Sequence, residues 1–264
     1  MIKIKQFIKN IGLRGITFAK GLKNFFNYLH SIIISFRSLK RLKLRAINKI
    51  IINQTKFTGI DALPFVIFIS LLIGGTIIIQ STKNFPKFGI ENFIGNLLVV
   101  IIGRELGPLL TALIVVGRSG SAIATEIATQ KWSKEILTFE LLGIDTKLYI
   151  VIPRIVASIL AIFGLIIMFD IAAFFGGYII SQTSVYIPVD VFIRSLLDSF
   201  SLTDLFSVII KSVAYGILIP LIACYYGFMP KSKFEIPIYV SKAVIRTLVT
   251  IFIINAIISV LFYF

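Results

Sequence analysis

The chain has 264 residues and a net charge of +15, and 57% of its residues are hydrophobic while only 15% are charged. Soluble domains are about 45–50% apolar and about 25% charged, so this composition excludes an ordinary soluble globular protein. Apolar runs of about twenty residues or more recur, and each is long enough to cross a hydrocarbon core of about 30 Å. We therefore expect an all-α, polytopic membrane protein.

The basic charge is concentrated in the N-terminal arm, where thirteen Lys and Arg and no acidic residue lie between Met1 and Lys56. Lysine mixes with isoleucine and phenylalanine at helical spacing here, which is typical of an amphipathic helix whose cations face anionic headgroups. A nucleic-acid-binding arm is the less favoured interpretation, because motifs that stack on bases or read grooves are missing. We predict an interfacial segment at residues 1–56 and a membrane domain at residues 57–264.

Five membrane spans follow in chain order, at about residues 61–80, 93–116, 148–181, 205–228 and 238–264. The third apolar run is long for one helix, so we expect it to be tilted or broken at Gly176-Gly177. The positive-inside rule places the N-terminus, the segment 118–147 and the loop 227–242 on the cytoplasmic or stromal side. The acidic loop 181–204 and the C-terminus then face the opposite side.

Arg104 and Glu105 are charged residues inside the second apolar run. Each such group costs roughly 2.5–3.5 kcal/mol at membrane depth on insertion scales, so both are expected to be functional. Neighbouring residues point about 100° apart on a helix and cannot pair with each other. Each therefore needs its own partner, a water-filled cavity or a polar group of a substrate. We favour a role in lining a transport cavity over structural ion pairs between helices.

Pro108 follows these charges and has no backbone N–H to donate to the carbonyl of Arg104. It therefore predicts a helix kink that leaves this carbonyl free. Asp170 is a further charge in the third apolar run, and a buried hydrogen-bonded residue is favoured there over a proton-relay acid. An ion-coupled secondary transporter that uses Glu105 and Asp170 is the alternative to the function developed below.

Enzyme chemistry is not expected from this chain. Gly117-Arg-Ser-Gly120 resembles the Gly-x-Ser-Gly of intramembrane serine proteases, but such a serine needs a base within hydrogen-bond reach. The single histidine, His30, lies in the basic arm outside every predicted span. The single cysteine, Cys224, lies in an apolar run and is expected to be a buried small hydrophobe. Since neither a P-loop nor a His-Glu-x-x-His sequence occurs, we predict that the chain holds no nucleotide cofactor and no metal.

The segment from Gln130 to Gly143 predicts a short amphipathic helix on the cytoplasmic side. Trp132, Ile136 and Phe139 would share one face of this helix, and Gly143 is a natural C-terminal stop. An interfacial helix is one interpretation. We favour docking onto a partner protein, because the segment is short and lies between two spans.

Four sequence motifs carry a resemblance to a known family. The run GRELGPLLTALIVVGRSGSAIATEIAT, which begins at Gly103, and the later ELLGID, VIPRIVA and KSVAYG strongly resemble the MlaE (YrbE-type) permease family. The similarity extends from about Asn53 to the C-terminus. The chain departs from the family at Lys134–Phe139, in the loop 227–237 and at Asn255, where an acid is common.

The resemblance implies the transmembrane subunit of an ABC-type lipid transporter, with an interfacial helix followed by five spans. Such subunits form a homodimer, bind a separate ATP-hydrolysing subunit on the cytoplasmic side and an MCE-domain substrate-binding protein on the other side, and move phospholipids or similar lipids. The matching lipid-cavity residues are Arg104, Glu105 and Leu106. The matching coupling helix includes Gln130, Trp132, Lys134, Glu135, Ile136, Phe139 and Gly143.

Residue usage adds an expectation about location. Isoleucine, phenylalanine and lysine are used heavily, and their codons are rich in A and T. Plastid-encoded members of the family exist, so we expect the inner envelope membrane of a plastid, with a bacterial inner membrane as the alternative.

Overall fold

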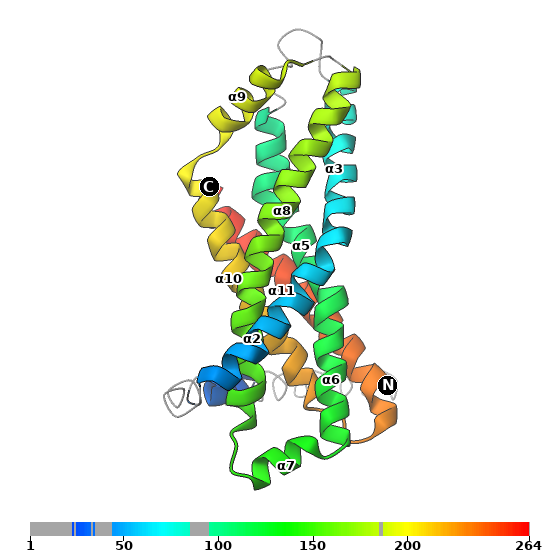
Figure 1. Ribbon diagram of the computed structural model, residues 1–264, viewed down its shortest axis with the longest axis vertical. Coiled ribbons are helices and arrows are strands. Elements are labelled where there is room, and N and C mark those ends of the chain that lie inside the picture. Colours follow the sequence, from blue (N-terminus) through cyan, green and yellow to red (C-terminus); the bar gives the residue numbers. More distant parts are fainter. Residues whose placement is uncertain are drawn as a thin grey trace, which may run out of the picture.

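The computed structural model describes residues 23, 25–32, 34, 44–84, 95–184 and 187–263. Within these ranges the chain forms helices and turns without strands, and five helical segments are long and apolar enough to cross a membrane. This confirms the predicted number of spans. They form one tall bundle (Figure 1). The five segments are Asn48–Ser81, Gly95–Trp132, Lys147–Thr183, Leu202–Gly227 and Lys233–Tyr263.

The first span begins earlier than predicted, because helix α2 (Leu44–Thr58) leads into α3 (Leu63–Asn84) through a short turn at Ile60–Ala62. A Cβ on Gly59 would lie 3.3 Å from the Cβ of Ala161, so this turn packs tightly against the third span. Helix α2 also packs along the third span. The last part of the predicted interfacial arm therefore packs against the bundle. Most of the remaining arm lies outside the described residues, of which 25–32 are helical.

The second span is one continuous helical segment that runs well past residue 116, where we predicted its end. Its π-helical stretches Val99–Leu106 and Val116–Gly120 alternate with α5 (Gly107–Val115) and α6 (Ser121–Trp132). Arg118, the first residue of the segment predicted to be cytoplasmic, donates from Nη1 to the carbonyl oxygen of Phe57 at 2.7 Å. The end of α2 thus binds the Arg118 guanidinium, so this charge is compatible with a helix that continues within the bundle.

The third span is α8 (Ile152–Ser184), which follows a π-helical turn at Lys147–Val151 and passes unbroken through Gly176-Gly177. The predicted break is therefore wrong. A Cβ on Gly176 would lie 2.5 Å from the carbonyl oxygen of Leu71, and one on Gly74 would lie 1.9 Å from that of Ala173. These glycines let the backbones of α3 and α8 touch, as small residues do in membrane helix pairs.

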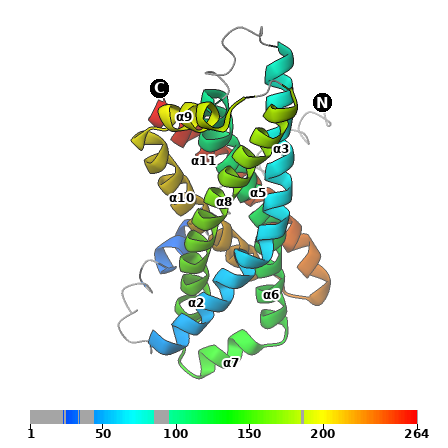
Figure 2. The same ribbon diagram turned by 45° about the horizontal axis from the view of Figure 1, so that its top comes forward.

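The remaining elements are α9 (Val189–Ser199), α10 (Leu202–Gly227), a short turn at Lys233–Glu235 and α11 (Ile236–Tyr263). Helix α9 lies across the end of the bundle (Figure 2), where a Cβ on Gly95 would be 2.0 Å from the Oγ of Ser195. Helix α10 packs against both α8 and α11. The core includes Val66, Ile102, Ile162, Phe169 and Ile219, which are fully buried.

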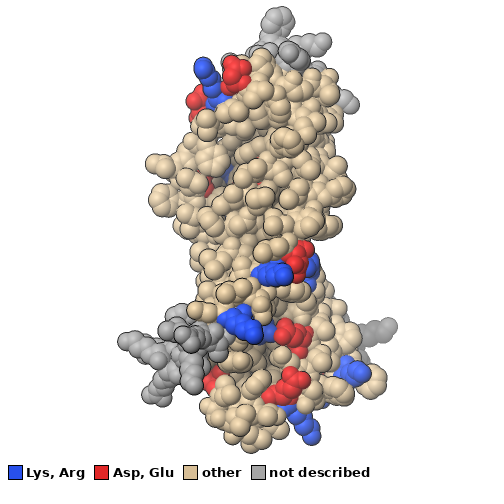
Figure 3. Space-filling view, in the orientation of Figure 1, with Lys and Arg blue, Asp and Glu red and all other residues tan. Residues whose placement is uncertain are grey.

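On the face shown in Figure 3, charged side chains lie at the upper end and over the lower half of the molecule, and the surface between them is mostly apolar. Helix α7 (Glu135–Leu141) and the turn after α10 lie at one end, and α9 lies at the other (Figure 1). The positive-inside argument grouped the same segments in the same way. The two groups of segments therefore lie at opposite ends of the bundle, and the assignment of one end to the cytoplasmic side stays a prediction.

Candidate functional site

A network of polar side chains joins the second span to α10 and α11. Arg104 Nε lies 2.9 Å from Asp204 Oδ1, and its Nη2 donates to Oδ2 at 3.4 Å. Asp204 also caps its own helix, because its Oδ2 accepts the backbone N–H of Ser201 at 3.0 Å. The hydroxyl of Tyr263 donates to Oδ1 of Asp204 at 3.1 Å, and the Arg104 guanidinium lies 4.9 Å from the centre of that ring. One carboxylate thus links the ends of two helices to Arg104.

Glu105 is held by partners from the same two helices. Its Oε2 accepts the Lys211 ammonium at 3.3 Å and the amide of Asn255 at 3.0 Å. The hydroxyl of Tyr215 donates to Asn255 Oδ1 at 2.7 Å, which orients the amide so that its nitrogen faces Glu105. Asn255 therefore acts as a neutral donor to a carboxylate.

Pro108 and Lys211 are related through the backbone carbonyl of Arg104. Pro108 cannot donate to the carbonyl of Arg104, and the Lys211 ammonium donates to that oxygen at 2.6 Å. Lys211 also donates to Ser259 Oγ at 2.9 Å. The predicted loss of the backbone donor at Pro108 is therefore compensated by a side chain from α10. Pro108 itself lies where the π-helical stretch changes to α5.

The charges of the network balance, since Arg104 and Lys211 oppose Glu105 and Asp204. Lys211 is 0% exposed and Asp204 2%, whereas Arg104 and Glu105 keep 24% and 37% of their side-chain surface. The buried partners hold the two charges that sequence analysis selected, and these two remain accessible to a polar ligand group. Arg104 and Glu105 each have their own interhelix ion pair. The lining of a lipid cavity by these two residues and by the half-buried Leu106 stays a prediction.

The partners themselves were not selected from the sequence. Asp204 fell in a predicted loop, and Tyr263 and Ser259 are ordinary residues of an apolar run. Lys211 and Tyr215 lie in the KSVAYG motif, and a lysine in the middle of the fourth span carries the same energetic signal as Arg104. The sequence could therefore have identified Lys211 as a candidate residue, whereas its ion pair with Glu105 could be found only from the fold.

The other candidate residues lie apart from this network. Asp170 is almost fully buried on α8 and packs against Gly107, where a Cβ would lie 2.2 Å from Oδ1. Ser119 is fully buried, and its hydroxyl has no hydrogen-bond partner in the part of the chain that the structure describes, while His30 is exposed on the N-terminal helix. Cys224 is buried and unpaired. Among the described residues, no group of three or more His, Cys, Asp or Glu is placed to hold a metal ion.

The predicted coupling helix is not one helix. Helix α6 ends at Trp132, Lys134 adopts a left-handed conformation with φ of 63°, and α7 (Glu135–Leu141) then starts in a new direction. Trp132 is 52% exposed while Ile136 is 7% exposed, so these two residues do not share a face. Because periodicity assumes an unbroken helix, it could not reveal this turn. Gly143 ends the segment with φ of 72°, as predicted from its missing side chain.

The individual residues of this segment fall into two groups. Gln130 and Glu135 make local exposed contacts, to Glu126 and Ser133. Phe139 packs on Tyr149 with ring centres 5.7 Å apart, which ties α7 to the bundle. Beyond it, Leu141 and Leu142 are 80% and 70% exposed and form an apolar tip.

The fold and the site define a polytopic membrane protein whose bundle holds an ion-pair network and presents a short helix at one end. Comparison with known proteins gives its family. The model of the MlaE permease family matches residues 51–261, and the chain belongs to this family. It is a permease subunit of the ABC transporter type, a transport component and not an enzyme, and such subunits work with partner ATPase subunits.

Named relatives occur in bacteria and in plastids. A probable ABC transporter permease protein of Rickettsia typhi is 31% identical over 215 residues, which cover 81% of this chain and 83% of the relative. The chloroplastic protein TRIGALACTOSYLDIACYLGLYCEROL 1 of Arabidopsis thaliana is 30% identical over 80% of this chain and 61% of its own length. The probable ABC transporter permease protein ycf63 of Pyropia yezoensis is 27% identical over 87% of this chain and 88% of its own length.

Proposed function

We propose that this permease subunit moves phospholipids or similar lipids, driven by ATP hydrolysis on a separate subunit. The observation that carries the proposal is the half-accessible pair Arg104 and Glu105, held by buried partners inside an apolar bundle. A lipid has a charged headgroup and apolar chains, and this surface offers a fixed cation and a fixed anion among apolar side chains. The chloroplastic relative, whose name contains a galactolipid, supports a lipid as the cargo.

The proposed assembly is a homodimer with its lipid cavity at the dimer centre, an ATPase subunit at the α7 end and an MCE-domain protein at the α9 end. In support, α11 presents a row of exposed apolar residues that lipid or a second copy can cover: Ile245, Val249, Phe252, Ile253 and Ile257. The proposed location is a plastid inner envelope membrane, which the plastid relatives support, with a bacterial inner membrane as the alternative.

The first test reconstitutes the full complex in vesicles and measures ATP-dependent transfer of a fluorescent phospholipid. Arg104→Gln is expected to reduce transfer about tenfold or more, because a hydrogen bond between charged groups contributes about 1.5–3 kcal/mol. Lys49→Gln, a matched change at an exposed cation on α2, is expected to leave transfer unchanged.

Two results would contradict the proposal. Purification in mild detergent that yields neither a bound lipid nor a co-purifying ATPase would remove its basis. Flux driven by a pH gradient in vesicles that contain this chain alone, and lost in Glu105→Gln, would instead support the ion-coupled alternative with Asp170.

A second test concerns the apolar tip of α7. We expect Leu141→Glu to weaken binding of the ATPase subunit about tenfold, because it places a charge where an exposed leucine would be buried in the interface. Leu197→Glu on α9, at the other end of the bundle, is the matched control and should bind the ATPase normally. Equal ATPase affinity in both variants, measured by co-purification and stimulated ATP hydrolysis, would show that α7 is not the coupling element.

A further inference from the structure

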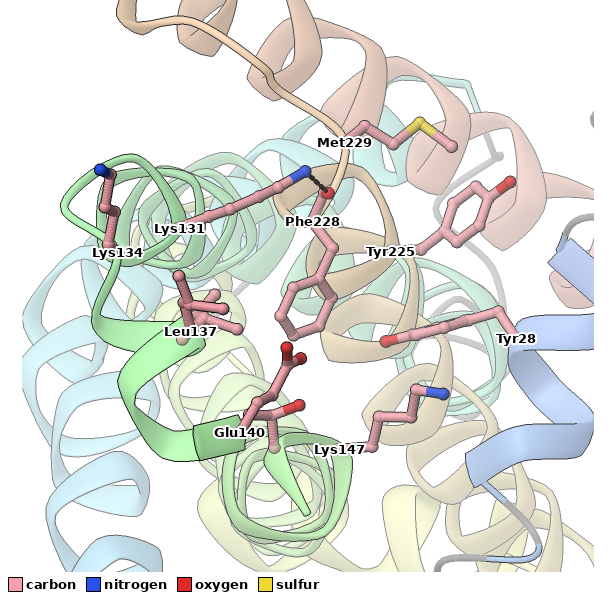
Figure 4. Close-up of a pocket in the computed structure, with 11 residues that line it drawn as sticks. Tyr28, Lys131, Lys134, Leu137, Glu140, Lys147, Tyr225, Phe228 and Met229 are labelled. Atoms are coloured by element: carbon pink, nitrogen blue, oxygen red, sulfur yellow. Dashed lines mark hydrogen bonds between the residues drawn. The ribbon is translucent and has the colours of Figure 1, made fainter. Parts of the chain in front are cut away.

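A second concave site lies at the α7 end, away from the ion-pair network. It has a volume of about 570 Å³, within the range of roughly 300–1,000 Å³ that is typical of ligand pockets. Its walls come from the N-terminal helix, the end of α6, helix α7, the turn before α8 and the end of α10 (Figure 4). These elements are far apart in the sequence, so the pocket exists only in the folded chain.

The lining of this pocket has two chemical parts. Its apolar part is made by Ile136, Leu137, Phe228 and Met229. Its polar part holds three lysines against one glutamate: Lys131, Lys134 and Lys147 against Glu140. Lys131 is already engaged, because its ammonium donates to the carbonyl of Phe228 (Figure 4). The pocket therefore combines a net positive charge with an apolar wall.

Tyr28 provides a second, independent observation on this pocket. Its ring packs on Tyr225, with ring centres 5.2 Å apart, and its hydroxyl enters the pocket (Figure 4). The hydroxyl is buried and has no hydrogen-bond partner among the described residues. Burial, and secondarily Cys224, raises the pKa of this phenol, so the group stays a proton donor. A buried donor without an acceptor is costly, and an acceptor atom of a ligand in the pocket would satisfy it.

The position of the pocket along the membrane normal indicates the source of such a ligand. The spans that form it end at Trp132 and Gly227 and begin at Lys147, so three span boundaries meet around it. Helix α10 has 26 residues and is therefore about 39 Å long, close to the roughly 40–45 Å of a bilayer with its headgroups. A helix of this length that spans the bilayer places its end, and with it this pocket, at the level of the lipid phosphates.

We propose that this pocket binds one anionic phospholipid from the surrounding leaflet, in addition to any lipid that is transported. A phosphate oxygen would accept the Tyr28 hydroxyl and pair with Lys147, while the start of an acyl chain would pack on Leu137 and Phe228. Because α7 forms one wall, a lipid here sits between that helix and the bundle and stabilises their relative position. The binding itself does not depend on the transport function proposed above.

The test titrates the full-length protein in its complex, in non-ionic detergent, with dioctanoyl phosphatidylglycerol and counts retained lipids by native mass spectrometry. We expect one phosphatidylglycerol per chain at this site. Tyr28→Phe keeps the ring but removes the donor, and Lys147→Gln removes the charge. Each is expected to weaken retention about tenfold, as expected for a lost hydrogen bond to a charged group. Tyr239→Phe and Lys49→Gln are the matched controls and should retain the lipid normally.

Arg104→Gln separates this site from the proposed transport cavity, because retention in the pocket should survive that change. Equal retention of dioctanoyl phosphatidylcholine, or unchanged retention in both pocket variants, would overturn the proposal. Competition by sn-glycerol 3-phosphate at equal concentration would show that a soluble phosphate compound, and not a lipid, is the ligand. Retention by the chain purified without the ATPase subunit, but not by the complex, would assign the pocket to an acidic segment of that partner.

Discussion

Lys211→Met is expected to lower the free energy of unfolding by about 3 kcal/mol, because the change leaves the Glu105 carboxylate without its cationic partner inside the bundle. The Arg104 carbonyl, which already lacks a backbone donor from Pro108, also loses its ammonium donor. Methionine has a similar length, so lost packing contributes little. Thermal denaturation in detergent should show a melting temperature several degrees lower, together with loss of lipid transfer.

A double-mutant cycle separates the ion pair from other effects. Glu105→Gln in the Lys211→Met background removes the unpaired charge, so most of the lost stability should return. Lys49→Met, at an exposed site, should change stability by less than about 0.5 kcal/mol. If the double variant is as unstable as Lys211→Met alone, the charge of Glu105 is not what Lys211 compensates.

The second large effect is expected at the contact between α3 and α8. Gly74→Ala places a Cβ 1.9 Å from the carbonyl oxygen of Ala173, and this backbone atom cannot move without displacing α8. Overpacking of this kind costs about 1–3 kcal/mol or more. We expect a lower melting temperature in detergent and a lower yield of folded protein.

Gly164→Ala on α8 is the matched control for this change. A Cβ at Gly164 meets no atom within 4 Å, and alanine is favoured over glycine in a helix by about 1 kcal/mol. The same substitution should therefore be neutral or stabilising there. A Gly74→Ala protein as stable as the wild type would show that the two helices are farther apart than the structure places them.

The membrane class and the number of spans could be predicted because the bilayer imposes one strong rule, that spanning segments are long and apolar. Their boundaries were harder to predict. The second span was predicted to end at about residue 116, yet the helix continues, and Arg118 donates a hydrogen bond to the carbonyl oxygen of Phe57. Gly176-Gly177 suggested a break, yet α8 continues and Gly176 allows close packing on Leu71. In each case the helix continues where the local sequence predicted an end or a break, and the residue that contacts it there is distant in the sequence.

The coupling segment shows the same limit. Gly143 was identified correctly as a helix stop, because its role depends on its own backbone. The turn at Lys134 was missed, because lysine carries no signal for a left-handed conformation. The family motifs end at Thr129 and resume at Glu140, so they did not specify the path of the chain between these residues.

The sequence by itself determined that this chain spans a membrane five times, that it belongs to a permease family and that Arg104 and Glu105 each need a partner. Only the tertiary structure decided the partners. Asp204 and Lys211 lie 100 and 106 residues away along the chain, and no local pattern states which helix faces meet. The reason is physical, since the cost of a charge in an apolar run is a local property, whereas its compensation depends on how distant helices pack.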